Sequence, residues 1–518
     1  MPKSGLPGHA SPGERHADAR SARARENDGR PSAAAGPVRG GRGARGDHFS
    51  RRPRRTPAWV PVLCVVALLV AVATGAFALV EDGTVALPWA SGGADAAAGA
   101  GAAAGAGSAA GAGAAAGAGP AAGAGPAATP DAPQAEPTKV RLVMAGDILK
   151  HMLLVQSGAK ADGTYDFDHV YAHVTDELAG FDLRVVNQET PAAGTSLGLS
   201  GYPSFNGPLE FNDATAKAGF NVVLKATNHA MDAGYDGIHS ELAYWREKYP
   251  AVRTLGVVDR ETDDSTSPYE PYVYEKDGLK VGLLNFTYDL NGYPDPKDAV
   301  ALLDWGHEDE VRAAIRKARQ EADLVVVFPH WGTEYQLTPS DEQESWAKVF
   351  AEEGVDLVVG DHPHVIEPVE VLTRPDGKGM LCYWSVGNFV SNQNDNQNLV
   401  GGLAEVTLER DADGTCHVGD YAFVPVVCHK GSGADFTTYL LRDYTDELAA
   451  TNASVYVNNS SCTVEWVDGF CAQVLGSAYD PGAHELRGTV TGAGDASGDG
   501  GTAGGDAASG AGGLADAA

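Results

Sequence analysis

Residues that can bind a metal recur at the ends of apolar runs through the middle of this chain. The six runs are Arg141–Ala145 before Gly146-Asp147, Leu183–Val186 before Asn187-Gln188-Glu189, Asn221–Ala226 before Thr227-Asn228-His229, Leu324–Phe328 before Pro329-His330, Val355–Val359 before Gly360-Asp361-His362-Pro363-His364, and Leu381–Val386 before Gly387-Asn388. Carboxylates, imidazoles and amide oxygens are the side chains that hold divalent metal ions in proteins. Their repeated position predicts one metal centre rather than six unrelated loops.

The elements that would position these residues follow an α/β pattern. Helical periodicity marks 167–178, 237–247, 307–321 and 341–353, each between apolar runs, and further β-like segments lie at 272–274, 279–286, 365–372 and 403–408. In an open α/β sheet the carboxyl ends of neighbouring strands face one crevice, where ligands bind. We therefore expect an α/β domain over 138–409, with two sheets whose strand ends converge on the site.

Each motif taken alone also has a structural interpretation. Asp147 could cap a following helix, and Glu189 and Glu334 could be loop acids. Asn228-His229 could form a turn, in which Asp232 shapes the backbone or orients His229. The strongest local signal for metal binding is His362-Pro363-His364, because two imidazoles separated by one stiff residue can face two adjacent ions.

The rest of the chain predicts a membrane-anchored protein. Residues 1–57 have 13 Lys/Arg and 5 Asp/Glu and read as a disordered basic tail, and 58–80 is an uncharged apolar run long enough to span a bilayer. The Arg cluster at 51–55 favours a cytoplasmic N-terminus and an extracytoplasmic main domain at the cell membrane; a cleaved signal peptide is the alternative. The formal net charge of −31, or −39 without the tail, argues against nucleic acid as a partner.

The remaining segments are simpler. Residues 81–137 are rich in Ala, Gly and Pro and predict a flexible linker, and 487–518 predict a disordered tail. Residues 410–486 read as a small C-terminal extension that carries four cysteines, for which we expect the disulfides Cys416–Cys428 and Cys462–Cys471 in an oxidising compartment, two other connectivities being open. Cys382 is expected to be a buried free thiol.

The region 139–409 resembles the bacterial capsule-synthesis family CapA, which is linked to poly-γ-glutamate production. The motifs that carry the resemblance are Gly146-Asp147, Asn187-x-Glu189, Asn228-His229-Ala-x-Asp232, His330-Trp331-Gly332-x-Glu334, Gly360-x-His362-Pro-His364-Val365 and Gly387-Asn388-Phe389. That family is similar to calcineurin-type metallophosphoesterases, whose fold is a four-layer α-β-β-α sandwich. The resemblance implies this fold class for the present chain.

The resemblance also implies a centre for two divalent ions, with Mn, Fe or Zn favoured by the ligand types. Asp147 and His364 would bind one ion, Asn228, His330 and His362 the other, and Glu189 would bridge them. His229 would face the leaving group, with Asp232 and Glu334 supporting the site. One departure concerns the Asp-x-His pattern of phosphoesterases, which is Asp147-Ile148-Leu149 here, with His151 two positions further on.

Three functions fit these residues. The first is a membrane-anchored metal-dependent hydrolase in the biosynthesis of poly-γ-glutamate or another capsule polymer. Its partners would be the membrane, other capsule synthesis and export proteins, and an anionic envelope polymer or a phosphoester substrate. The second is a non-catalytic scaffold in a synthesis or export complex, which the incomplete Asp-x-His pattern favours. The third is a general extracellular metallophosphatase.

Overall fold

The computed structural model describes residues 136–262, 266–431 and 435–491, all of which lie in one compact unit of the chain. The expected tail, span and most of the linker fall outside these residues, as does nearly all of the expected C-terminal tail. Among the helices within the described ranges, none is both long enough and apolar enough to cross a membrane.

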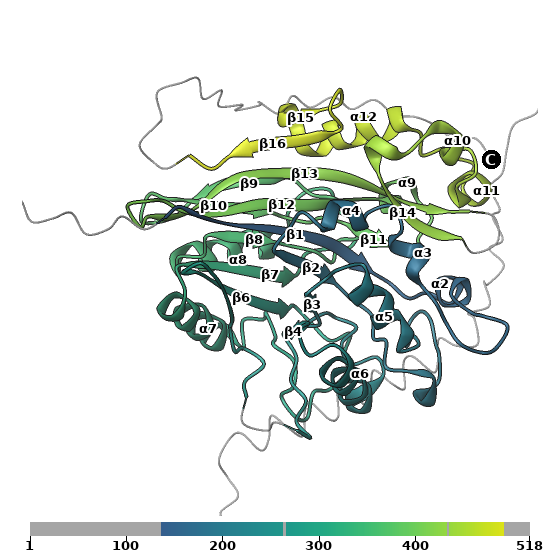
Figure 1. Ribbon diagram of the computed structural model, residues 1–518, viewed down its shortest axis with the longest axis horizontal. Helices are drawn as coiled ribbons and strands as arrows, with labels where there is room; N and C mark the ends of the chain where they lie inside the picture. The colour runs from purple at the N-terminus through teal and green to yellow at the C-terminus, as the bar shows by residue number, and fades with distance from the viewer. Residues whose placement is uncertain (1–135, 263–265, 432–434, 492–518) are drawn as a thin grey trace, which may run out of the picture. The chain divides into compact units, whose positions relative to one another are not determined.

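The described strands form two sheets (Figure 1). The larger has ten strands: β1 (Thr138–Ile148), β2 (Leu183–Asn187), β3 (Val222–Leu224), β4 (Arg253–Leu255), β11 (Asn388–Val390), β12 (Val400–Arg410), β13 (Cys416–Lys430), β14 (Phe436–Leu440), β15 (Tyr479–Asp480) and β16 (Glu485–Thr489). The smaller has six: β5 (Tyr272–Lys276), β6 (Leu279–Thr287), β7 (Leu324–His330), β8 (Leu357–Val359), β9 (Val369–Thr373) and β10 (Gly379–Tyr383). Each of the six apolar runs contains one strand, as predicted.

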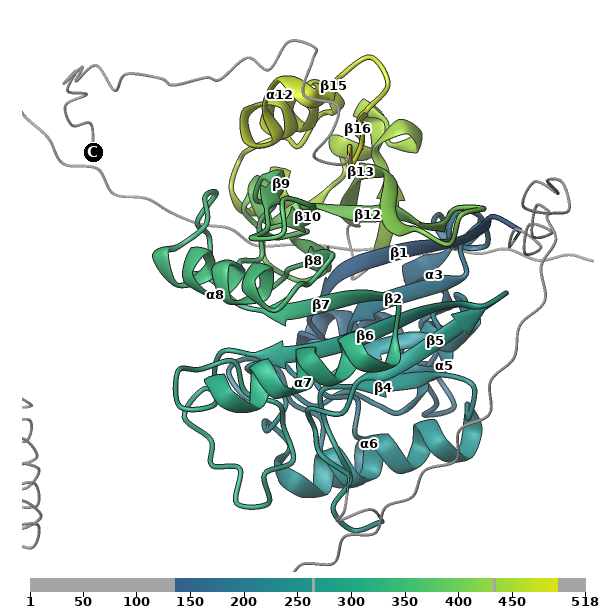
Figure 2. The same ribbon diagram turned by 90° about the vertical axis from the view of Figure 1, so that its left-hand side faces the viewer.

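Helices cover the outer faces of both sheets (Figure 2). The helices are α2 (Met152–Ser157), α3 (Asp168–Tyr171), α4 (Thr175–Leu178), α5 (Glu210–Lys217), α6 (Gly234–Lys248), α7 (Glu308–Glu321), α8 (Asp341–Glu352), α9 (Asn396–Leu399), α10 (Asp446–Ala449), α11 (Ala453–Val457) and α12 (Val464–Leu475). α7 and α8 pack on the smaller sheet, while α3 and α5 pack on the larger one. The fold is a mixed α/β sandwich.

The main core lies between the two sheets. Leu142 of β1 and Val185 of β2 belong to the same buried cluster as Val326 of β7 and Leu357 of β8. Because parallel strands of a buried sheet are covered on both faces, they form nearly continuous apolar runs, as β7 does from Leu324 to Pro329. The core therefore fixes the ends of β1, β2, β3, β7 and β8 relative to one another.

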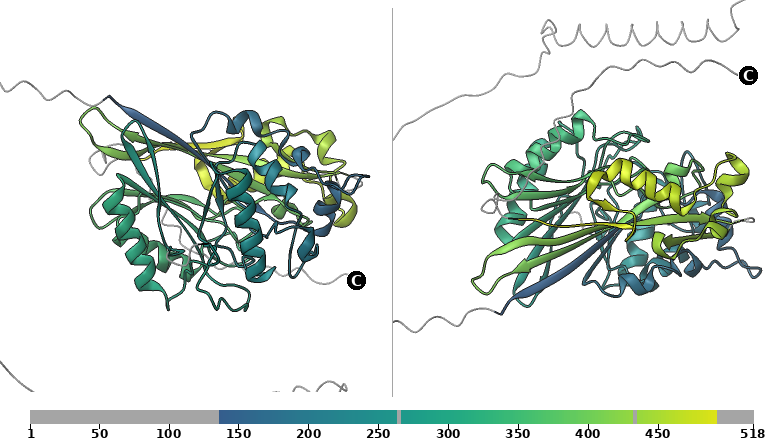
Figure 3. Two further views of the ribbon diagram at one scale, coloured as in Figure 1. Left: turned by 60° about the horizontal axis from the view of Figure 1, so that its bottom comes forward. Right: turned by 90° about the horizontal axis from the view of Figure 1, so that it is seen from above.

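The segment 410–486, expected to be a small extension, contributes strands to the larger sheet. β13 pairs with β12 on one side, and with β16 and β14 on the other. Helix α12, drawn in yellow, lies over these strands in Figure 3 and contributes Val467 and Leu475 to the main core.

The two expected disulfides are wrong, because all five described cysteines are free. Cys416 and Cys428 lie twelve positions apart on the single strand β13, so a rise of about 3.3 Å per residue keeps them tens of ångströms apart. Cys462 precedes α12, and Cys471 lies in the third turn of that helix. The rise along these turns separates the two Cα atoms by more than the roughly 7 Å that a disulfide tolerates. Cys382 is a buried free thiol, as expected.

Candidate metal centre

Asp147 lies where β1 changes its pairing partner. β1 pairs with β12 through Ala145 and with β11 from Asp147 onward, and its pairing with β2 is irregular between these two residues. Gly146 stands at the change, and a Cβ there would lie 1.8 Å from the carbonyl oxygen of Gly387. Only glycine permits this close approach. The irregularity places the Asp147 carboxylate, fully buried, at the carboxyl end of the sheet.

Glu189 lies at the middle of the candidate site, two residues after β2. Its side chain is fully buried, and neither carboxylate oxygen has a hydrogen-bond partner. Its Oε1 lies 3.9 Å from Nε2 of His229 and 3.8 Å from Nε2 of both His330 and His364. These distances are too long for hydrogen bonds. Burial, followed by the charges of Asp147 and Asp361, raises the pKa of Glu189 well above its ordinary value.

His330 is the last residue of β7 and is fully buried. Its Nδ1 lies 2.5 Å from Oδ1 of Asp361, and its Nε2 lies 3.0 Å from Oδ1 of Asn228. Burial lowers the pKa of His330 to about 3, so the ring is neutral, as a metal-binding imidazole must be. A carboxylate on one ring nitrogen, with the other nitrogen facing the site, is the arrangement that orients histidine ligands.

His362 and His364 follow β8 in a strained loop. Both have positive φ values, 99° and 59°, which non-glycine residues adopt rarely. Nδ1 of His364 lies 3.0 Å from Oδ2 of Asp147, and the backbone N–H of His362 donates to the same oxygen. The Nδ1 atom of His362 is buried without a partner. Burial would raise the pKa of Asp147, but the hydrogen bond and charge of His364 outweigh it and lower that pKa.

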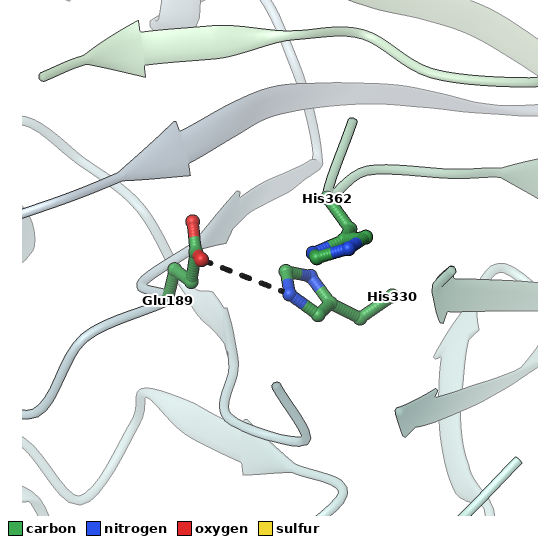
Figure 4. A group of neighbouring side chains, drawn as sticks. All are labelled: Glu189, His330 and His362. Atoms are coloured by element: carbon green, nitrogen blue, oxygen red, sulfur yellow. Dashed lines mark ion pairs between the residues drawn. The ribbon is translucent and has the colours of Figure 1, made fainter. Parts of the chain in front are cut away.

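These side chains form two neighbouring clusters of potential ligands. Glu189, His330 and His362 make one, and Asp147, Glu189 and His364 make the other, with ligand atoms within 4.8 Å of one another in each. Figure 4 shows the Glu189 carboxylate facing the ring of His330, beside the ring of His362. Unsatisfied buried oxygens and a bare ring nitrogen are costly unless something binds them. The residues therefore fit a divalent ion in each cluster.

The remaining predicted site residues divide into two groups. His229 is buried at the site, and its Nδ1 lies 2.7 Å from Oδ2 of Asp232. Glu334 is exposed in the loop after β7 and belongs to neither cluster, although its charge contributes to the raised pKa of Glu189. His151 directs its Nδ1 to the backbone N–H of Asn392 and also lies outside both clusters.

Two buried residues of the site, Asn187 and Asp361, stood in the predicted motifs without an assigned role. Asn187 ends β2, donates to Oδ1 of Asp147 at 2.8 Å, and lies 3.2 Å from Nδ1 of His330. Asp361 holds His330 and forms a third cluster with it and Asp147. Asn187 lies two positions before Glu189, and Asp361 lies directly before His362, so their position at the end of an apolar run was a usable signal.

Part of the chain is similar to known proteins. Residues 141–393 match the family described as bacterial capsule synthesis protein PGA_cap. The chain is 30% identical over 217 residues to the PGA biosynthesis protein CapA of Bacillus subtilis, and 28% identical over 316 residues to the capsule biosynthesis protein CapA of Bacillus anthracis. Residues 141–393 are therefore CapA-like. The matches cover 42% and 59% of the chain, and 53% and 71% of these CapA proteins, so the alignment spans about half of the first.

Solved structures similar to this chain include two nucleotidases. The 5'-nucleotidase precursor of Thermus thermophilus is 16% identical with a TM-score of 0.36, covering 65% of the chain and 59% of that protein. The NAD nucleotidase of Haemophilus influenzae is 13% identical with a TM-score of 0.37, covering 65% and 68%. At these values the likenesses carry no weight for function.

Proposed function

We propose that this CapA-like protein is a metal-dependent hydrolase or transferase of capsule polymer biosynthesis. The observation that carries the proposal is the environment of Glu189, a buried carboxylate with two unpaired oxygens and three imidazole Nε2 atoms nearly equidistant from one of them. A structural carboxylate in such a position would be hydrogen-bonded or paired at close range. A carboxylate that bridges two cations would have no hydrogen-bond partner from the protein, because both of its oxygens would bind the ions.

In the proposed centre, Asp147 and His364 would hold one ion, Asn228, His330 and His362 the other, and Glu189 both. The two clusters that share Glu189 support this assignment, and so does the short separation of Asn228 Oδ1 from His330 Nε2. A mixed nitrogen and oxygen ligand set favours Mn, Fe or Zn over Ca. The ions, when bound, would acidify water and polarise an oxygen of a phosphoryl or carbonyl group.

The protein's own contribution to the reaction would come from His229. Its contact with Asp232 favours the tautomer that carries a proton on Nδ1, which leaves Nε2 facing Glu189 and the site. From there Nε2 could accept a proton from an attacking water or, when protonated, donate one to a leaving group. Asp232 also accepts from the backbone N–H of Phe205 at 2.7 Å, and this second bond fixes the carboxylate that orients His229.

The names of the relatives point to poly-γ-glutamate or a related capsule polymer as the product pathway. In this proposal residues 58–80 anchor the chain in the cell membrane, and the folded unit works outside it beside other capsule synthesis or export proteins. The acidic composition makes broad contact with a polyanion unfavourable, so contact with such a polymer would be confined to the metal centre.

Metal content of the full-length protein tests the proposal. We expect about two transition-metal ions per chain after reconstitution with Mn, Fe or Zn. The His362→Ala, His364→Ala double variant should lose them while keeping the wild-type circular dichroism spectrum. The loaded wild type should also hydrolyse a generic aryl phosphoester, and Glu189→Gln should not. A folded protein that binds no metal under any of these conditions would refute the proposal and favour a scaffold.

A further inference from the structure

A shallow groove begins beside the metal centre and runs along the loop that contains α9. It consists of two open hollows of about 410 Å³ and 470 Å³, both of which Asp395 lines. Tyr335 lines the hollow nearer the centre, and Trp466 and Phe470 of α12 line the further one. The loop and the segment before α12 are joined by hydrogen bonds, including Asn396 to the carbonyl of Ser461 at 3.1 Å.

The near end of the groove touches the ligand loop of the metal centre. The backbone N–H of Tyr335 donates to the carbonyl of Pro363 at 2.8 Å, and the Tyr335 ring lies 6.1 Å from the ring of His364. Asn398 donates to the carbonyl of His364 at 2.9 Å. A molecule lying in the groove would therefore extend to the rim of the centre.

The walls of the groove are rich in carboxamides. Gln393, Asn394, Asn396, Gln397, Asn398, Asn458 and Gln473 all line it. Among the described residues that line the two hollows none is Lys or Arg, and the single carboxylate, Asp395, accepts from Asn458 at 2.8 Å. Lys430 donates to Oδ1 of Asn394 at 2.7 Å, but its side chain is buried and lines neither hollow.

Two carboxamides and one indole in the further hollow are free to bind a ligand. Within the described part of the chain, the side chains of Gln397 and Gln473 form no hydrogen bond, and Gln473 is exposed. Trp466 is half-buried and stacks on Phe470 with ring centroids 5.2 Å apart. Each carboxamide can both donate and accept, and a braced indole face offers a flat apolar platform.

From this lining we infer that the groove binds a neutral glycan strand. Sugar hydroxyls need partners that both donate and accept, and the apolar face of a pyranose ring stacks on an indole. A polyanion such as poly-γ-glutamate would need cations to neutralise its carboxylates, and the lining has none to offer. Binding of the strand needs no metal; only its role as the molecule presented to the metal centre rests on the proposed function.

Calorimetric titration of the full-length protein tests the inference. The probes are hexasaccharides of glucose and of N-acetylglucosamine, with a γ-glutamate hexapeptide for comparison, and the protein is kept in EDTA. Because residues 58–80 are expected to span a membrane, the detergent must have no sugar head group. We expect a neutral hexasaccharide to bind and the γ-glutamate peptide not to bind. Trp466→Ala should weaken saccharide binding by about five- to tenfold.

Two further variants keep the outcome decisive. Gln473→Ala changes an exposed side chain, so it should fold normally and still weaken binding by a few fold. Trp305→Ala is the matched control, because Trp305 is 49% exposed and lines neither hollow. Saccharide binding that Trp466→Ala and Gln473→Ala leave unchanged would overturn the inference, as would preferential binding of the γ-glutamate peptide or the absence of saccharide binding. Since metal content is measured separately, these results would leave the proposed metal centre standing.

Discussion

A buried ion pair beneath Glu189 yields the most direct test of how this site is held. Lys225, which follows β3, places its Nζ 3.1 Å from Oε2 of Glu241 on α6, and the two side chains are only 6% and 3% exposed. The same Nζ donates to the carbonyl of Gln188, while the side chain of Gln188 donates to Oε1 of Glu241 at 2.6 Å. The ion pair thus forms hydrogen bonds with both the backbone and the side chain of Gln188, the residue immediately before Glu189.

Replacing Lys225 by Met should destabilise the fold strongly. The change leaves the Glu241 carboxylate buried without its cation and the Gln188 carbonyl without its donor. Removing one partner of a buried pair costs about 3–5 kcal/mol, against a total stability of about 5–15 kcal/mol for a typical domain. Removing both charges together, in Lys225→Met, Glu241→Leu, should restore part of the loss, because no unpaired charge then remains in the core.

Urea unfolding in EDTA measures these differences without any contribution from bound metal. Lys160→Met is the matched control, since Lys160 forms an ion pair of 2.6 Å with Asp166 at the surface, where the side chains are 50% and 35% exposed. An exposed pair of this kind contributes at most about 1 kcal/mol. If Lys225→Met costs no more than Lys160→Met, or if the double variant is less stable than the single one, the buried pair does not brace the loop as described.

Three further changes have defined outcomes. Glu189→Gln should raise the melting temperature in EDTA, because burial and neighbouring carboxylates raise the pKa of Glu189 and make its charged form unfavourable. The same variant should no longer be stabilised by Mn. A lower melting temperature in EDTA would contradict this prediction. Burial raises the pKa of Glu367 from 4.5 to about 7, so the folded state holds the proton of this carboxyl more tightly than the unfolded state does. The resulting contribution to the free energy of unfolding is complete below pH 4.5 and is lost as the pH rises through 7. Glu367→Gln should remove this loss, at most roughly 3 kcal/mol between pH 5 and 8, and parallel stability–pH curves for variant and wild type would refute the assignment. Gly146→Ala should yield little folded protein, because its Cβ would clash with Gly387, and normal yield and stability would exclude the close approach.

The framework of the fold follows from periodicity in the sequence. The segment 307–321 was expected to be helical, and α7 covers Glu308–Glu321 with Val311, Ile315 and Ala318 buried along one stripe. The expected helix over 167–178 instead divides into α3 and α4, with Ala172, His173 and Val174 between them. Strands were found from uninterrupted apolar runs because those strands are buried on both faces.

Interactions between distant segments could not be predicted in the same way. β13 belongs to the main sheet because it pairs with β12. Its own sequence does not specify that partner. The two expected disulfides rested on proximity in sequence, which an extended strand turns into separation in space. Lys225 and Glu241 are ordinary charged residues in the sequence, and only the packing of α6 onto the Glu189 loop makes them a buried pair.

The distribution of ligands between the sheets ties the chemistry to the fold as a whole. The larger sheet and its loops supply Asp147, Glu189 and Asn228, whereas the smaller sheet supplies His330 and the loop of His362 and His364. Each of the three clusters at the candidate centre takes ligands from both sheets.

Asn285 shows how the two halves are locked in register. From β6 of the smaller sheet, its Oδ1 accepts from the backbone N–H groups of Lys225 and Ala226 in the larger sheet, at 3.1 Å and 2.8 Å. Its side-chain amide donates to the carbonyl of Phe328 on β7, two residues before His330. One buried carboxamide therefore connects the loop that leads to Asn228 and His229 with the strand that ends in His330. The distances at the candidate centre depend on sheet packing, and changes in the core between the sheets should act on metal binding without touching a ligand.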